Sequence, residues 1–337
     1  MNPQLLDKVC CPGCRGVLEG GGGAEVRCAA CGATYAVRDG VLDLHPQPSH
    51  GAAEEMAAHE AMERRWLAEV VPPALRPLVT GEAGLANLLA MPHCAHPALI
   101  AAVPDIRRVH EMADDFYELL HRLQLHGSEH VLEVGAHLGW AAYRLAQRTG
   151  YVVASDISHQ LAIAQGFVDH GPAFDRVYCD MMDLPFRPDR FDLVFGVAVA
   201  HHADDLVRLF SQCHRVLRVG GRAVFFAEPV AAVGDASAKA DFGVEEKAFG
   251  VQEHIYTIDE YFTAAKAAGF TPSVLPLTGI LRESGRKWPW VRRVWRASLR
   301  SGIGYWAPFT RSLYPRMLRY YPRLPFPRFA LVLRRRG

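Results

Sequence analysis

The spacing of apolar and polar positions changes along the chain. From residue 129 onward, short β-rich apolar runs alternate with segments of helical period, which is typical of a parallel sheet covered by helices. Before them, the pattern predicts helices over Ala52–Val70 and Ile106–Leu125. Seven runs predict strands: His130–Gly135, Tyr151–Asp156, Arg176–Asp180, Phe191–Val199, Arg222–Ala227, Thr271–Leu277 and Phe329–Leu333.

Cysteines are concentrated at the start of the chain. Cys11, Cys14, Cys28 and Cys31 follow a C-x2-C-x13-C-x2-C spacing. Two such turns bring four thiolates within reach of one tetrahedral zinc ion, and four protein ligands leave no open position for catalysis. We therefore expect a structural zinc site, with redox dithiols or disulfides as the alternative. Cys10 is an alternative to Cys11, although its spacing to Cys14 is poorer.

Helix and strand breakers mark the end of this cysteine-containing part. The sequence HPQPS at residues 45–49 interrupts regular structure and reads as a linker. We therefore divide the chain into a zinc-ribbon module (1–45), a linker and helical connector (46–127) and an α/β domain (128–337). The last of these contains an insertion, residues 278–328, which is described below.

Composition excludes several classes of protein. The chain has 337 residues, of which 50% are hydrophobic and 22% charged, so general disorder is excluded. Its apolar runs fall short of the roughly 20 residues of a spanning helix, and Met1–Pro12 lacks the features of a secretory signal. We expect a cytoplasmic protein.

Charge is distributed unevenly. The 37 Lys and Arg nearly balance the 36 Asp and Glu, but residues 281–337 hold 15 of the basic residues and one acid, Glu283. This stretch therefore carries a net charge of +14, and residues 1–280 carry −13.

The first predicted strand leads into a glycine-containing turn. Residues 131–140 read VLEVGAHLGW, and Gly135 and Gly139 allow the backbone to approach a ligand. The second strand ends 21 residues beyond Gly135 in Asp156, where a ribose hydroxyl pair would need a carboxylate. Ligands of open α/β sheets bind at the carboxyl ends of the strands, so this edge is the expected site.

Residues 129–278 resemble a class I S-adenosylmethionine-dependent methyltransferase of the quinone and small-molecule type, the methyltransferase type 11 pattern. The resemblance rests on that turn, on FDLV at 191–194, on RVLRVGG at 215–221 and on VAHH at 199–202. It implies a Rossmann-like seven-stranded sheet, mostly parallel, with the last strand antiparallel. It also implies that S-adenosyl-L-methionine is bound by Glu133, Gly135, Ala136, His137, Gly139, Asp156, Ile157, Asp180, Met181 and Val197.

One position departs from the family pattern. His137 stands where the family has a glycine. A positive φ would strain this residue, so we expect the turn to adapt, with a side chain that faces the cofactor as the alternative.

Methyl transfer from a sulfonium needs an aligned nucleophile and removal of its proton. His201 and His202, after the fourth strand, are candidate bases, and Glu228, after the fifth, is a candidate for orienting the acceptor. The alternative is that one histidine packs against the cofactor and the other caps the next helix, while Glu228 is an ordinary loop acid.

The insertion 278–328 alternates aromatic and basic residues, as in WPWVRRVWR at 288–296. A helical lid, contact with an anionic membrane surface and contact with RNA are three interpretations of this pattern. The module 1–45 is similar to the small zinc-ribbon activators of RNA and protein methyltransferases. Residues 196–202, however, lack the Asn/Asp-Pro-Pro-aromatic sequence common in base-amino methyltransferases.

We therefore predict methyl transfer to an O, N or acidic C nucleophile of a small or lipid-like acceptor. This acceptor would allow peripheral contact with the inner face of the membrane. Methylation of rRNA or tRNA, with the zinc ribbon and insertion holding RNA, is the alternative function. A catalytically inactive scaffold is a further alternative.

Overall fold

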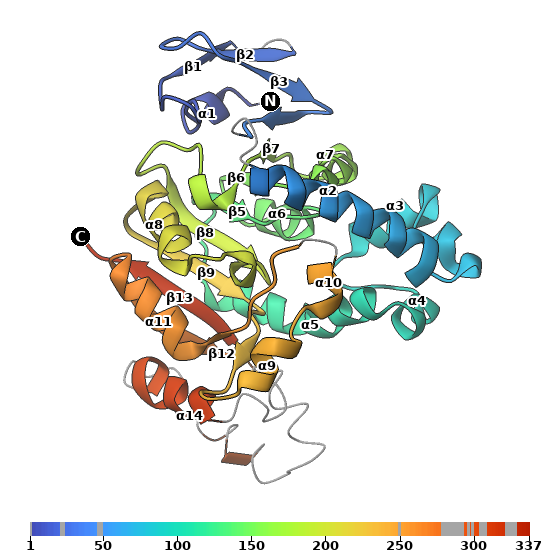
Figure 1. Cartoon of the computed structure of the whole chain (residues 1–337), viewed down its shortest axis with the longest axis vertical. Coiled ribbons are helices and arrows are strands. Elements are labelled where there is room, and N and C mark those ends of the chain that lie inside the picture. Colours follow the sequence, from blue (N-terminus) through green and yellow to red (C-terminus); the bar gives the residue numbers. More distant parts are fainter. Residues whose placement is uncertain are drawn as a thin grey trace.

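One continuous β-sheet runs through the chain in the computed structural model (Figure 1). The structure describes residues 2–20, 24–45, 50–248, 251–277, 293–294, 297, 300–302, 309–320 and 329–337. Within these residues the sheet has 11 strands in the order β1-β2-β3-β4-β7-β6-β5-β8-β9-β13-β12. Their bounds are β1 (Leu18–Gly20), β2 (Glu25–Cys28), β3 (Thr34–Arg38), β4 (Val41–Asp43), β5 (His130–Val134), β6 (Tyr151–Asp156), β7 (Asp175–Tyr178), β8 (Phe191–Val197), β9 (Leu217–Phe226), β12 (Phe270–Pro276) and β13 (Phe329–Arg335).

The seven predicted strands form the larger part of this sheet. Strands β7, β6, β5, β8 and β9 are parallel neighbours, and β13 lies antiparallel between β9 and β12. This confirms the predicted Rossmann-like, mostly parallel arrangement with an antiparallel last strand.

The predicted sheet size is wrong, because the N-terminal strands extend the same sheet. β4 pairs in parallel with β7, in the register Val41↔Arg176 to Asp43↔Tyr178. β1 to β4 form an antiparallel meander on that added edge. The backbone groups of β7 that would otherwise form an edge are therefore paired within the chain.

Helices cover both faces of the sheet. Inward side chains of α8 and α11 pack with Leu132 and Val134 on one face, and those of α5 and α6 pack with Val131 on the other. The helices are α1 (Pro3–Leu6), α2 (His50–Arg65), α3 (Gly81–Ala90), α4 (Pro97–Ala102), α5 (Pro104–Arg122), α6 (Trp140–Ala146), α7 (Gln165–His170), α8 (Leu206–Val216), α9 (Ala236–Asp241), α10 (Val244–Ala248), α11 (Ile258–Ala267) and α14 (Tyr314–Tyr320). A second, two-stranded sheet pairs β10 (Val230–Ala231) with β11 (Tyr256–Thr257).

Local sequence explains the helix that follows the fourth strand of the parallel set. α8 buries Leu206, Leu209, Phe210 and Cys213, which recur at helical spacing on one face. Asp205 caps its first turn by accepting a hydrogen bond from the Arg208 backbone N–H. The helix therefore starts directly after the loop that carries the two candidate histidines.

Much of the insertion 278–328, including all its tryptophans, lies outside the described residues. The described part includes α14, where Arg319 pairs with Asp259 of α11 at 2.9 Å. Across the described ranges, no helix is long and apolar enough to cross a bilayer.

Candidate functional site

The turn between β5 and α6 keeps the backbone close to a neighbouring loop. Gly135 has φ +64°, and a Cβ added there would lie 2.0 Å from Cγ2 of Val199. Gly139 has φ +78° and precedes α6, and its Cβ would lie 2.7 Å from that of Ala164. Both positions therefore exclude a side chain, and the turn packs closely against Val199 on one side and Ala164 on the other.

His137 adopts φ +49° in this turn. The expectation that the turn adapts is therefore wrong: the backbone keeps the left-handed conformation that a glycine would have, and histidine is one of the residues that this region tolerates. The His137 N–H donates to Oδ2 of Asp156 at 2.6 Å, which ties the turn to the end of β6.

Asp156 is positioned by two backbone donors. Its Oδ1 accepts the N–H of Ser158 at 2.6 Å and its Oδ2 that of His137, and only 9% of the residue is exposed. A carboxylate has about four lone-pair sites, so each oxygen keeps one for a further donor. Ile157 follows directly and starts the loop that leads to α7.

Glu133 lies at the end of β5 and is 1% exposed. Its Oε2 has no hydrogen-bond partner within the described part of the chain. Burial raises the pKa of this carboxyl well above its ordinary value, although a backbone hydrogen bond opposes the shift. A buried oxygen of this kind is satisfied when a donor from a bound molecule reaches it.

Two further strand ends lie beside these. Asp180 follows β7 and caps the turn Met181–Asp183 by accepting the Met182 N–H at 2.7 Å. Burial raises the pKa of Asp180. Val197 ends β8, so the residues expected to bind the cofactor occupy the carboxyl ends of four adjacent parallel strands.

His201 forms a buried dyad with Glu228. Nδ1 of His201 lies 2.9 Å from Oε2 of Glu228, and this oxygen also accepts the backbone N–H of His201. Oε1 of Glu228 accepts the backbone N–H groups of Val199 and Ala200. Burial alone would raise the pKa of Glu228, but the hydrogen bond from His201 and those backbone donors lower it. A carboxylate is an acceptor only, so Nδ1 of His201 carries a proton and Nε2 faces the other way.

Glu253 approaches the dyad from a loop that sequence reasoning did not select. Its Oε2 lies 3.5 Å from Nε2 of His201, and the residue is 8% exposed. Burial would lower the pKa of His201, but the hydrogen bond and charge of Glu228, followed by the charge of Glu253, raise it. Glu253 follows no predicted strand, and no motif in the sequence marked it.

His202 has a different environment from its neighbour. Nδ1 of His202 lies 2.7 Å from the Gln252 carbonyl oxygen, so this nitrogen carries a proton. Burial, followed by the charge of His201, lowers the pKa of His202 to about 3. The ring of His202 is therefore neutral. The pKa values of the two adjacent histidines are shifted in opposite directions, up for His201 and down for His202.

The trio of His201, His202 and Glu253 has the composition of a metal site, with one atom of each within 4.8 Å of the others. The proton on Nδ1 of His202 is committed to the Gln252 carbonyl oxygen at 2.7 Å, which occupies the nitrogen nearest Glu253. Nδ1 of His202 is therefore engaged with the backbone in this arrangement.

Helix α2 contributes a second residue that the sequence did not reveal. His59 lies near Asp156 and His137: burial lowers its pKa, and the charge of Asp156 partly opposes the shift. In the same helix, Glu60 lies 3.2 Å from Nδ1 of His159, beyond the end of β6. α2 therefore reaches the loop after β6, as Figure 1 also shows.

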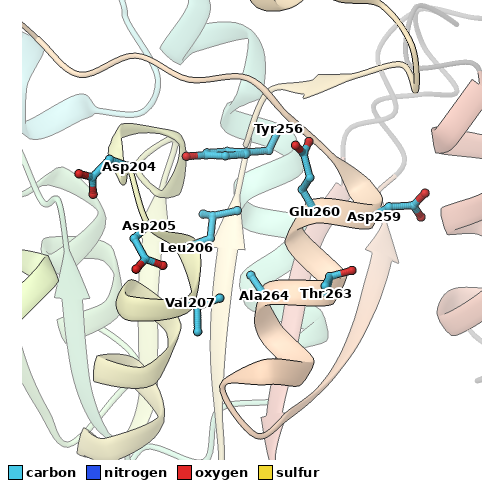
Figure 2. Close-up of a pocket in the computed structure, with 9 residues that line it drawn as sticks. All are labelled: Asp204, Asp205, Leu206, Val207, Tyr256, Asp259, Glu260, Thr263 and Ala264. Carbon is cyan, nitrogen blue, oxygen red and sulfur yellow. The ribbon is translucent and has the colours of Figure 1, made fainter.

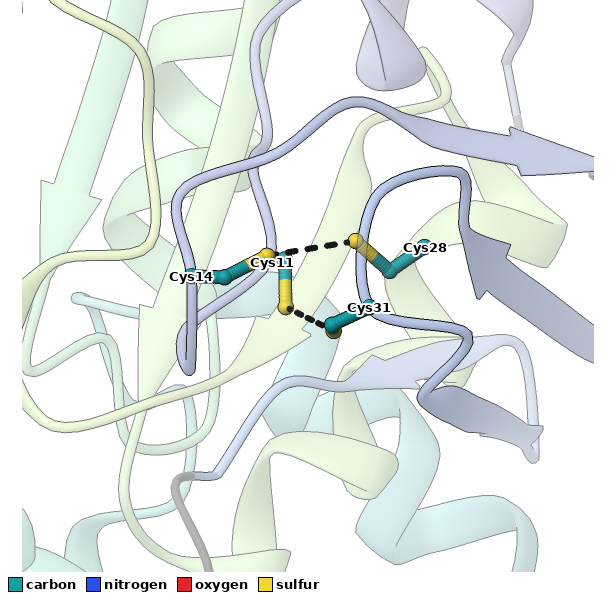
Figure 3. Close-up of side chains that lie close together, drawn as sticks. All are labelled: Cys11, Cys14, Cys28 and Cys31. Carbon is teal, nitrogen blue, oxygen red and sulfur yellow. Dashed lines mark hydrogen bonds between the residues drawn. The ribbon is translucent and has the colours of Figure 1, made fainter.

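The structure gathers the four cysteines of the C-x2-C pairs (Figure 3). Sγ of Cys11 lies 3.7 Å from that of Cys31, and Sγ of Cys14 lies 3.4 Å from that of Cys28. Tetrahedral zinc with Zn–S bonds of about 2.3 Å places sulfurs about 3.8 Å apart, so these distances fit a metal and are too long for disulfides. The Cys10 sulfur is not part of this group.

A surface groove of about 420 Å³ lies between the N-terminal ends of α8 and α11 (Figure 2). It is lined by Asp204, Asp205, Leu206, Val207, Tyr256, Asp259, Glu260, Thr263 and Ala264. None of the residues predicted to bind the cofactor lines it. Two of its acids are already paired, Asp259 with Arg319 and Glu260 with Lys239.

Comparison with known proteins shows that the central segment of the chain is similar to methyltransferases. Residues 132–225 match the methyltransferase domain model. The chain is 34% identical over 116 residues to "Methyltransferase GfsG" of Streptomyces halstedii, an alignment that covers 33% of this chain and 41% of that protein. It is 31% identical over 158 residues to "27-O-demethylrifamycin SV methyltransferase" of Amycolatopsis mediterranei, with coverage of 44% and 57%.

The chain therefore spans about half the length of these curated relatives, or less. Among solved structures, phosphoethanolamine N-methyltransferase 2 of Haemonchus contortus, in complex with S-adenosyl-L-methionine, is 20% identical with a TM-score of 0.45. That match covers 66% of this chain and 53% of the other.

Proposed function

Because the chain carries a class I S-adenosylmethionine-dependent methyltransferase domain, we propose that it transfers a methyl group from S-adenosyl-L-methionine to a small or lipid-like acceptor. The acceptor atom is an oxygen, a nitrogen or an acidic carbon. When bound, the cofactor supplies a methyl group already activated on a sulfonium. The chain's own residues then have to hold both molecules and take one proton.

Asp156 is the observation that carries this proposal. Each of its oxygens accepts one backbone N–H and keeps a lone pair, which matches the two adjacent hydroxyls of a ribose. In this proposal, the unpaired oxygen of Glu133 accepts a hydrogen bond from the methionine part, and the turn from Gly135 to Gly139 lies against it. Asp180 and Met181 border the adenine.

We assign the proton-accepting role to His201. Glu228 fixes the ring through Nδ1 and raises its pKa, so Nε2 is the acceptor atom and is more basic than in free histidine. His202 is too weak a base for this role, since its pKa is lowered to about 3. His202 instead borders the acceptor through its ring, and Glu228 acts as the positioning residue.

The four cysteines are proposed to bind one structural zinc ion. Their spacing and their sulfur distances support this role, as does the hydroxyl of Tyr35, which lies 3.0 Å from Sγ of Cys11. With four thiolate ligands, the ion would stabilise the N-terminal module and take no part in chemistry.

A small-molecule acceptor is favoured over RNA by two observations. The curated relatives include one named for the small molecule 27-O-demethylrifamycin SV. The loop after β8 also presents histidines where base-amino methyltransferases commonly present the Asn/Asp-Pro-Pro-aromatic sequence.

The test has two steps. Calorimetric titration of the full chain with S-adenosylmethionine and S-adenosylhomocysteine should give dissociation constants on the order of micromolar. Transfer of a labelled methyl group is then measured against hydroxylated small molecules, anionic lipid vesicles and total RNA. Absence of cofactor binding refutes the function, and label in RNA alone refutes the acceptor class.

A further inference from the structure

The N-terminal module contacts both loops that border the proposed adenosine site. The first loop is residues 156–159, which begins with Asp156, the last residue of β6. The second loop is residues 180–184, which follows β7 and begins with Asp180. We call these the two adenosine loops, a name that rests on the proposed function.

His45 holds the first adenosine loop. Its Nε2 donates to the Ile157 carbonyl oxygen at 3.0 Å, one residue after Asp156, while its Nδ1 lies 2.9 Å from Oδ1 of Asp43. Asp43 is the last residue of β4. Its carboxylate therefore orients the His45 ring, which forms the hydrogen bond to the first adenosine loop.

An aromatic stack fixes the His45 ring further. The ring lies flat on Tyr178 of β7, with centroids 5.7 Å apart and planes at 5°. The Tyr178 hydroxyl in turn donates to the His159 carbonyl oxygen at 3.3 Å, in the same loop. The side chain of His45 is 11% exposed, so these contacts are largely shielded from water.

Arg15 holds the second adenosine loop. It follows the metal-site residue Cys14 directly, and its guanidinium donates to the Leu184 carbonyl oxygen at 2.9 Å and pairs with Asp183. This pair is more exposed, with 40% of the Arg15 side chain and 32% of the Asp183 side chain accessible.

The second loop has other supports. Arg215 of α8 also donates to the Leu184 carbonyl oxygen, and Arg208 donates to that of Met182. Loss of Arg15 should therefore loosen this loop less than loss of His45 loosens the first.

The β4–β7 ladder and the cysteine cluster place His45 and Arg15 beside the two adenosine loops. Because β4 runs parallel to β7, it ends at the same sheet edge, and His45 comes just beyond that end. The cysteine cluster fixes Cys14, and with it Arg15.

We propose that His45 and Arg15 are positioning residues for the cofactor. Through them, the N-terminal module sets the affinity of the site for the adenosine half of S-adenosylmethionine. Binding linkage is reciprocal, so cofactor binding should also tighten the attachment of the module.

The experiment measures binding of S-adenosylhomocysteine to the full chain by calorimetry. His45→Ala should weaken binding about tenfold and Arg15→Gln about threefold, since the second contact is more exposed. His45→Gln keeps one donor and should retain part of the affinity. Arg27→Gln, on an exposed position of β2 in the same module, is the matched control and should bind as the wild type does.

Zinc release gives a second readout that does not depend on activity. With a chromogenic chelator, saturating S-adenosylhomocysteine should slow zinc loss in the wild type and should do so less in His45→Ala. Zinc content and thermal unfolding of each variant show whether the module is still folded. If His45→Ala does not fold, His45→Gln and Arg15→Gln supply the same comparison.

The outcomes separate the two proposals. A wild-type chain that does not bind S-adenosylhomocysteine refutes the proposed function and this inference with it. A wild-type chain that binds, together with folded His45 and Arg15 variants of equal affinity, refutes only this inference.

Discussion

The substitution Gly135→Ala should destabilise the chain far more than the same change at Gly220. Both glycines have positive φ, +64° and +82°. Placing a Cβ in the left-handed region costs about 1–2 kcal/mol at either position. An added Cβ meets nothing within 4 Å at Gly220, whereas at Gly135 it would lie 2.0 Å from Cγ2 and 2.8 Å from Cβ of Val199.

The contact of the added Cβ with Val199 determines how much more stability Gly135→Ala should lose than Gly220→Ala. Val199 is 5% exposed, and its N–H is held by Glu228, so the loop cannot move away freely. Overpacking of this kind costs roughly 1–3 kcal/mol more. Gly135→Ala should therefore lower stability by about 2–5 kcal/mol, which corresponds to a fall in Tm on the order of 10 °C for a domain of this size.

Scanning calorimetry of the two alanine variants measures this difference directly. The double variant Gly135→Ala with Val199→Ala removes the contact at 2.0 Å and leaves the one at 2.8 Å, so it should be more stable than the sum of the single changes predicts. Equal losses of Tm at Gly135 and Gly220, or strict additivity in the double variant, would show that the close approach of the turn to Val199 is not present in solution.

Three other predictions concern the proposed binding and chemical groups. Cys28→Ser should release about one equivalent of zinc and lower the unfolding temperature of the N-terminal part, as read by metal analysis and calorimetry. Asp156→Ala should weaken S-adenosylmethionine binding by about 10–100-fold through loss of charged hydrogen bonds, while the exposed Asp169→Ala should not. Because the pKa of His201 is raised above 6.5, methyl transfer should increase with pH through a value above 6.5, and Glu228→Gln should move this rise to lower pH. A pH profile unchanged by Glu228→Gln would remove His201 from the role of base.

Strand prediction succeeded where a strand is buried on both faces. All residues of β6 are buried, so the run Tyr151–Asp156 stands out between polar segments and was predicted with its observed bounds. β9 begins at Leu217, five residues before its predicted start at Arg222. The glycines at 220 and 221 lie before that predicted start; β9 pairs with β8 at Leu217↔Phe191 and again from Arg222↔Leu193, and the glycines lie in the register shift between these two pairs.

The extended sheet was beyond sequence reasoning because its pairing is non-local. β4 is only three residues long, and its partner β7 lies more than 130 residues away in the chain. Neither the length of the segment Val41–Asp43 nor its pattern of apolar and polar residues specifies a parallel partner strand. The cysteine spacing therefore predicted a module, while only the fold shows where that module attaches.

The same limit applies to the site. Asp156 and Glu228 follow strands, so the rule that ligands bind at carboxyl ends of strands selected them. His59 and Glu253 reach the site from a covering helix and a long loop, and no local pattern marks such residues. Both became visible only through their burial beside Asp156 and His201.

The pairing of β4 with β7 also determines which other contacts should be lost when the proposed zinc ion is removed. In a seven-stranded sheet β7 would be an exposed edge, with free backbone groups open to pairing with other chains. Here that edge is covered, and the new edge strand, β1, is only three residues long and ends in Gly20. A module that loosens when Cys28 is replaced should expose β7 and release the His45 and Arg15 contacts at the same time. Loss of the proposed structural zinc ion should therefore weaken cofactor binding and promote association of the chain.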